Sequence, residues 1–222
     1  MPKNSEFESF YADNIPTALN DCQNAGYAPL FMPKIIERRI KNNGDSAIWK
    51  EWYVTPSIVA TGQTQKGSKV IVYAHIPNYL SKPENIRTAL DAGLSSGAGE
   101  IPQEEFLKLV GFAEKGKEGV FMVPYEKLMA SLSERIPVDS ALEHPQTLPF
   151  LGVDETTAKK YLEKHKEVYG DEIGIWHTDD FVDGKALGRM LCLGDYDDGF
   201  VGYSSLSNVA RFFGARVKSG EE

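Results

Sequence analysis

Residues 171–199 hold the side chains most able to do chemistry. An apolar, strand-like run leads there into His177, Asp179 and Asp180. Because alternate side chains of an extended chain point the same way, His177 and Asp179 are expected to face one point in space. An imidazole nitrogen beside carboxylate oxygens suits Mg²⁺, Mn²⁺ or Zn²⁺. Without a metal, the carboxylate would orient the imidazole as a general base. The alternative is a strand that ends in a polar loop, where Asp179 and Asp180 cap a following turn.

A second acidic group follows in the same segment. Carboxylates this crowded repel one another unless a cation, protons or water relieve the charge. The predicted metal ligands are His177, Asp179, Asp195, Asp197 and Asp198. A calcium loop is excluded, because Leu206 stands where a bidentate glutamate belongs. The pair Asp198-Gly199 between two apolar runs also predicts a hairpin turn, which is compatible with a ligand role if the turn folds over His177.

A third candidate is His75, near the end of the strand-like run 69–76. Strand ends that open into loops often carry functional side chains. The predicted catalytic residues are therefore His177, Asp179, Asp180 and His75. The alternative for His75 is a histidine satisfied within the core. If the two histidine-bearing strands are neighbours, His75 and His177 converge.

Several familiar sites are excluded. The chain has neither a Gly-x-Ser-x-Gly elbow nor a His-Glu-x-x-His helix, so serine-hydrolase and zincin assignments lack support. The glycine-rich segment 95–99 follows a predicted helix and precedes acidic residues, which would repel a phosphate. The two cysteines, Cys22 and Cys192, stand far apart among apolar neighbours, which predicts reduced, packed thiols.

Composition describes a soluble, acidic, globular protein. The chain has 222 residues, 41% of them hydrophobic, and a net charge of −8. Residues 112–222 hold 20 acidic and 13 basic side chains, against 12 and 11 in residues 1–111. That asymmetry argues against a nucleic-acid binder, which needs a positive footprint. No apolar run of membrane-spanning length and no secretory signal is visible, so we expect a cytoplasmic protein without membrane partners.

The order of predicted elements indicates the fold class. Apolar residues at helical spacing predict helices within 14–25, 33–42, 83–90, 102–113, 124–132 and 154–169. Strands are predicted at 47–54, 57–61, 69–76, 119–123, 172–177, 188–193, 200–203 and 209–217. Strands, then helices, then strands predict an α+β fold with a largely antiparallel mixed sheet and helices packed on it.

The predicted domain organisation is simple. Residues 14–218 are expected to form a single compact domain, with a possible internal seam in the proline-punctuated segment 136–153. Residues 1–13 are expected to form a flexible arm.

Two functions follow from these observations. The first is a metal-assisted hydrolase of a small polar substrate, in which a divalent ion such as Mg²⁺ or Mn²⁺, or His177, activates water. The second is a non-enzymatic, acidic interaction module that binds or inhibits a basic protein partner. The sequence does not predict an oligomeric state.

Overall fold

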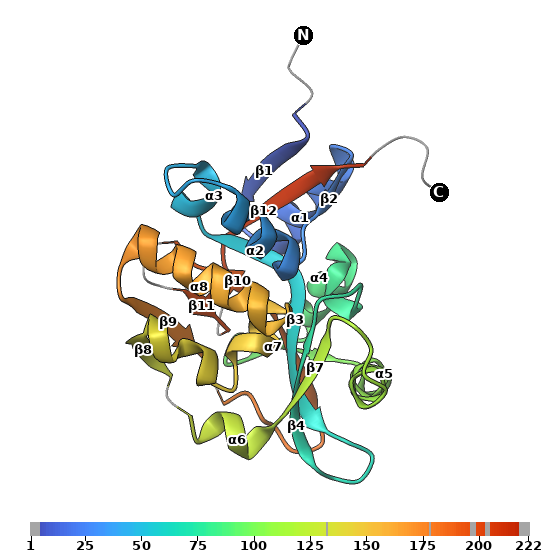
Figure 1. Cartoon of the computed structure of the whole chain (residues 1–222). Helices are drawn as coiled ribbons and strands as arrows, with labels where there is room; N and C mark the ends of the chain where they lie inside the picture. The colour runs from blue at the N-terminus through green and yellow to red at the C-terminus, as the bar shows by residue number, and fades with distance from the viewer. Residues whose placement is uncertain (1–4, 132, 178, 196–198, 203–204, 218–222) are drawn as a thin grey trace.

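A mixed sheet built around three long strands organises the molecule (Figure 1). The computed structural model describes residues 5–131, 133–177, 179–195, 199–202 and 205–217. The long strands are β3 (Tyr53–Gln63), β4 (Lys69–Ala74) and β10 (Ala186–Leu193). Shorter strands extend them: β5 (Leu94–Ser95), β6 (Ala98–Ile101), β7 (Val120–Pro124), β8 (Glu134–Pro137), β9 (Glu172–Trp176) and β11 (Phe200–Val201). Over the described residues the strand order is β7-β4-β3-β10-β11-β9-β8, with β6 pairing to β10 and β5 to β6. The β9–β11 pair is parallel and the other pairs are antiparallel.

A small second sheet brings the two ends of the chain together. It consists of β1 (Phe7–Ala12), β12 (Ala210–Arg216) and β2 (Tyr27–Pro29), in the order β1-β12-β2. Figure 1 shows both termini at this end of the molecule. The expected flexible arm is therefore wrong for residues 7–12, which pair antiparallel with β12 along the full strand. The ring of Phe7 also stacks on that of Phe213, so the strand is held by side chains as well as by its backbone.

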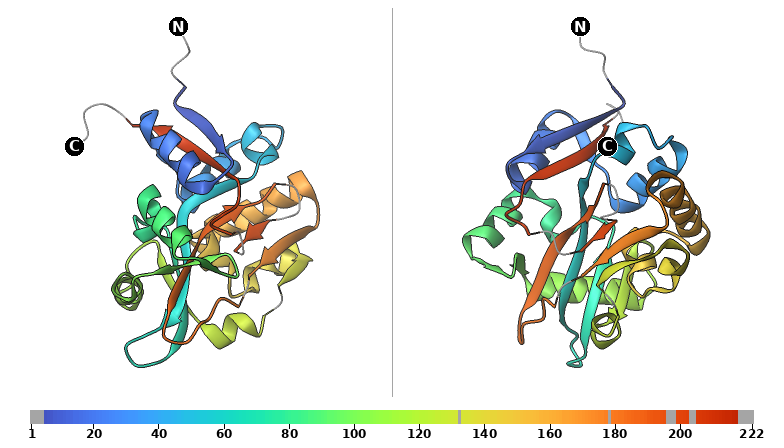
Figure 2. Two further views of the ribbon diagram at one scale, coloured as in Figure 1. Left: turned by 180° about the vertical axis from the view of Figure 1, so that it is seen from behind. Right: turned by 90° about the vertical axis from the view of Figure 1, so that its left-hand side faces the viewer.

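Helices cover both faces of the large sheet (Figure 2). The helices of one face are α1 (Ile15–Asn24), α4 (Pro83–Asp91) and α5 (Gln103–Glu114). Those of the other face are α2 (Met32–Lys41), α3 (Ala47–Lys50), α6 (Tyr125–Met129), α7 (Thr147–Leu151) and α8 (Glu155–Tyr169). Two 3₁₀ turns complete the described elements: η1 (Tyr79–Ser81) and η2 (Val138–Glu143).

The side chains that alternate along β4 explain why helices cover both faces of the sheet. Val70, Val72 and Ala74 belong to the core beneath α1, α4 and α5. Ile71 and Tyr73 belong to the core beneath α2, α7 and α8. Because both faces are apolar, the strand is stable only between two layers. The predicted single α+β domain with a mostly antiparallel sheet is thus confirmed.

The segment 136–153 lies within this domain. It contributes η2 and α7, whose Val138, Ala141 and Phe150 join the core beneath α8.

Every helix that the structure describes is too short or too polar to span a lipid bilayer.

The strands predicted at 47–54 and 57–61 are partly wrong. Residues 47–50 form the helical turn α3, and the remaining residues belong to the single strand β3, which contains Pro56. Val54 pairs with Cys192 and Ile58 with Met190, so three residues of β3 stand opposite one residue of β10. A bulge tolerates a residue without an N–H group. The Thr55 hydroxyl donates to the carbonyl of Leu191 there and satisfies a backbone acceptor.

A fully buried arginine joins the helical layer to the sheet. The Arg39 side chain donates to the carbonyls of Ile48 (2.9 Å), Glu51 (2.9 Å) and Gly194 (3.0 Å). Its guanidinium also lies 5.1 Å from the ring centroid of Trp49. Two of these carbonyls belong to α3 and the residue after it, and the third belongs to the residue after β10. One side chain therefore joins α2 to α3 and to the distant end of β10.

We predict that Arg39→Met lowers the free energy of unfolding by about 3 kcal/mol, because buried carbonyls lose their donors. Urea unfolding followed by circular dichroism measures the change. The exposed Arg87 on α4 offers a control, and Arg87→Met is expected to change stability by less than about 0.5 kcal/mol. Equal losses in the two variants would contradict this role for Arg39.

Candidate functional site

The first part of the candidate site lies where the chain leaves β9. The backbone N–H of His177 donates to Ser133 Oγ (3.0 Å), and the same hydroxyl donates to the His177 carbonyl (3.0 Å). The imidazole Nε2 lies 3.5 Å from Ser131 Oγ. The ring centroid of His144 is 6.3 Å from that of His177. His177 is thus a half-buried ring among serine hydroxyls and a second histidine.

Asp179 is exposed and works mainly as a turn cap. Its Oδ1 accepts a hydrogen bond from the backbone N–H of Phe181 at 3.1 Å and another from the Tyr125 hydroxyl. Burial and this carboxylate acceptor raise the pKa of the Tyr125 phenol, which keeps it a donor. Lys69 Nζ lies 4.2 Å from the Phe181 ring centroid, within cation–π range. The turn-capping interpretation therefore holds for Asp179.

Asp180 is buried and pairs with a residue of the sheet. Its carboxylate forms a buried, bidentate ion pair with Arg189 of β10, with Nε–Oδ2 at 2.5 Å and Nη2–Oδ1 at 2.7 Å. Two parallel charge-assisted hydrogen bonds fix both side chains. The expectation that Asp180 works beside His177 is not met, because its oxygens are used to neutralise a buried cation.

Arg189 also joins two further loops. Its Nη2 donates to the carbonyl of Ser96, in the turn between β5 and β6. The next residue, Gly97, accepts from the backbone N–H of Leu206 at 3.0 Å. A Cβ at Gly97 would lie 2.9 Å from both Arg189 and Ser205, and its φ is +93°. Only glycine lets the three loops meet this closely.

Main-chain bonds hold the remaining loops. The N–H of Gly202 donates to the Trp176 carbonyl (2.9 Å), and that of Gly194 to the Gly199 carbonyl (2.8 Å). Strands β10 and β11 pair on either side of the predicted hairpin turn, as expected. We call the described residues 176, 177, 179–185 and 205–209 the C-terminal loop surface. The positions of these loops depend on backbone groups and on Arg189.

A buried amide lies beneath this surface. Gln146 is fully buried, and its Nε2 donates to the Trp176 carbonyl at 3.1 Å. Its Oε1 has no hydrogen-bond partner among the described residues.

The described part of the chain contains no group of three or more His, Cys, Asp or Glu side chains placed to hold a metal ion. Asp195 is half-buried after β10, whereas Asp197 and Asp198 lie outside the described residues. The five-ligand metal site that the sequence suggests therefore stays a prediction.

His75 belongs to a different region. It is 7% exposed, its Nδ1 lies 2.9 Å from Ser57 Oγ, and its Nε2 lies 2.8 Å from the Pro149 carbonyl. Burial lowers its pKa to about 4, so the ring is neutral at pH 7. Because both ring nitrogens have protein partners, the core-histidine interpretation fits. Its contacts come from β3 and α7, whereas His177 contacts the segment between α6 and β8.

The sequence contained a usable signal for Arg189 but none for Tyr125. A lone arginine inside the apolar run Leu187–Leu193 indicates a buried charge, and such a charge needs a buried partner. Tyr125 lies 54 residues before Asp179, and no local pattern links them.

We predict that Asp180→Asn lowers the free energy of unfolding by about 3 kcal/mol, because Arg189 is left buried without a counter-charge. Chemical denaturation measures it, with Asp183→Asn on the same loop as the exposed control. The double variant Asp180→Asn/Arg189→Met should lose less than the sum of the single losses. Additive losses would contradict a direct pair.

We predict a histidine-dependent loss of stability in acid. The pKa of His75 falls from 6.5 to about 4 on folding, so the unfolded chain binds more protons between these values. Stability contributed by the neutral ring is complete above pH 6.5 and is lost as the pH falls toward 4. The loss should reach about 2 kcal/mol at about pH 4.5. In a plot of the urea midpoint against pH, the midpoint should fall less steeply below pH 6.5 for His75→Gln than for His177→Gln. Equal slopes in the two variants would refute the assignment to His75.

Comparison with known proteins gives a sparse but specific result. A scan of protein-family models finds none that matches, and a search of curated proteins finds no match either.

One solved structure, described as "Accommodation of massive sequence variation in Nanoarchaeota by the C-type lectin fold", is similar throughout. The TM-score is 0.89 and the sequence identity is 45%, over 97% of this chain and 100% of that chain. Identity at this level across nearly the whole chain shows common ancestry as well as a common fold. The chain therefore belongs to the nanoarchaeal family of variable proteins with the C-type lectin fold.

Proposed function

We propose that this protein binds another protein through the C-terminal loop surface and catalyses no reaction there. The observation that carries the proposal is the way the loops are held. Gly194, Gly199 and Gly202 use backbone groups, and the Asp180–Arg189 pair is buried. Exposed side chains on the same loops can therefore change without loss of the scaffold.

The similar solved structure supports this interpretation. Its description says that the C-type lectin fold accommodates massive sequence variation. A fold tolerates such variation where side chains point outward from a backbone that is fixed independently of them. In this chain His177, Asp183 and Ser207 fulfil that condition, since they are exposed or half-buried.

The chemistry of the surface favours a basic partner. Asp179 and Asp183 supply negative charge, the ammonium of Lys185 on the same loop is paired with Glu100, and Trp176 and Phe181 supply partly exposed aromatic area. Aromatic side chains are enriched at protein interfaces, and complementary charge speeds association and selects partners.

Metal-assisted hydrolysis of a small polar substrate has weaker support. Asp180 is committed to Arg189, and Asp179 accepts from Tyr125 and from the turn that it caps. The carboxylates of Asp179 and Asp180, which the sequence suggested as catalytic, therefore have structural roles.

We predict that the loop surface tolerates randomisation and yields binders. In a surface-display library, five exposed or half-buried positions are randomised: His177, Asp183, Ser207, Asn208 and Val209. Most clones should still display folded protein, and selection against a basic test protein such as cytochrome c should give clones with Kd of about 1 μM or tighter.

A matched library randomises exposed positions of α5 and its C-terminal end: Gln103, Glu104, Lys108, Glu114 and Lys115. It should also fold but yield no binders, because those side chains stand on a convex helix. A third library at Gly199 and Gly202 should lose display, since a Cβ there would lie 2.3 Å and 2.8 Å from backbone oxygens. Equal yields of binders from the first two libraries, or widespread misfolding in the first, would overturn the proposal.

A further inference from the structure

A groove separate from the loop surface lies between η2, α7 and α8. Its cavity volume is about 520 Å³. Four apolar side chains form its floor: Val138, Leu142, Leu148 and Leu162. Asp171 precedes β9 at this end, whereas His177 follows β9 at the other. Six residues of extended chain separate the two positions by about 20 Å.

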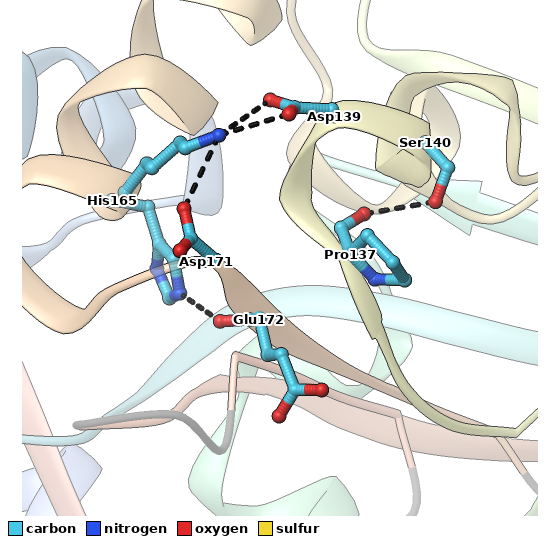
Figure 3. A network of polar contacts seen from close by, with 7 residues as sticks. Pro137, Asp139, Ser140, His165, Asp171 and Glu172 are labelled. Carbon is cyan, nitrogen blue, oxygen red and sulfur yellow. Dashed lines mark hydrogen bonds and ion pairs between the residues drawn. The ribbon is translucent and has the colours of Figure 1, made fainter.

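The groove is built from fixed parts (Figure 3). Lys166 Nζ contacts Asp139 Oδ1 (3.0 Å), Asp139 Oδ2 (2.9 Å) and Asp171 Oδ1 (3.2 Å), so it joins α8 to η2 and to the start of β9. These two carboxylates raise the pKa of the Lys166 ammonium. The backbone N–H of Val138 donates to the Asp171 carbonyl at 2.8 Å. His165 Nε2 lies 3.2 Å from the Glu172 carbonyl on the inner side of α8.

The rim of the groove is acidic. Glu155 and Glu163 of α8 and Glu143 of η2 are exposed along it. Lys166 is already engaged by two aspartates, which leaves Lys159 as the other basic residue lining the groove. Glu155, Lys159 and Glu163 are spaced by four residues and share one face of α8. Thus an apolar floor is bordered by three carboxylates and one uncommitted ammonium group.

We propose that this groove docks an amphipathic, basic segment of a partner protein. Apolar side chains of the segment would cover the floor while its lysines or arginines meet the glutamates, as in helix-in-groove recognition. The charge of the rim selects this occupant, because an acidic segment or an anionic lipid surface would be repelled. The two surfaces are independent: one presents exchangeable side chains, and the other is a preformed receptor.

A charge-reversal experiment tests the groove. The probe is a fluorescein-labelled, 14-residue amphipathic peptide of leucine and lysine, and polarisation is measured at physiological salt. The full chain is expected to bind it saturably, and Glu143→Lys/Glu163→Lys should weaken binding about tenfold or more. Glu104→Lys/Glu114→Lys on α5 changes the net charge equally and should leave affinity within about threefold.

Methyl NMR locates the contact directly. Addition of the peptide should shift the resonances of Leu142, Leu148 and Leu162 and leave those of Val182 and Val209, on the loop surface, in place. Equal weakening by both double variants would reduce the binding to net charge and overturn the proposal. Absence of saturable binding up to about 100 μM would overturn it as well. Neither outcome bears on the display libraries, so the two proposals fail separately.

Discussion

A buried positive charge and the partner it requires determine the arrangement of the loops around the candidate site. Arg189 projects from β10, where it is 1% exposed, and an unpaired guanidinium there would cost several kcal/mol. Asp180 neutralises it, and the Ser96 carbonyl accepts a further hydrogen bond. The loop after β9 and the β5–β6 turn are therefore held against the same strand, and Gly97 joins the segment around Leu206 to them. Asp180 contributes to the site by fixing its backbone.

Arg39 satisfies buried polar groups on the face of the sheet that α2 and α8 cover. There the uncompensated groups are carbonyls at the ends of α3 and β10, and the guanidinium supplies donors to all of them. The hydrophobic layers provide most of the burial, but they do not specify how a short helix meets a strand end. The hydrogen bonds of Arg39 and Arg189 specify these positions, because a hydrogen bond depends on direction as well as on distance.

The molecule thus combines two kinds of surface. Backbone hydrogen bonds and a buried ion pair hold the C-terminal loop surface, so its outer side chains, apart from the turn cap Asp179, have little structural role. The groove beside α8 is different, because its apolar floor belongs to the core and its walls are joined by Lys166.

Local sequence patterns are enough to predict the fold class and most of the helices and strands. Asn14 and Asp154 cap α1 and α8 as their side chains predict, and the apolar faces of β4 required two covering layers. Such signals are local, because capping and periodicity act within a few residues. Contacts between distant parts of the chain determine that residues 7–12 pair with β12, that Pro56 lies in a bulge and that Asp180 pairs with Arg189. The first two depend on distant strands, and the direction of a carboxylate depends on which cation the fold brings beside it. For that reason the crowded aspartates were visible in the sequence, but their division into a turn cap and a buried counter-ion was not.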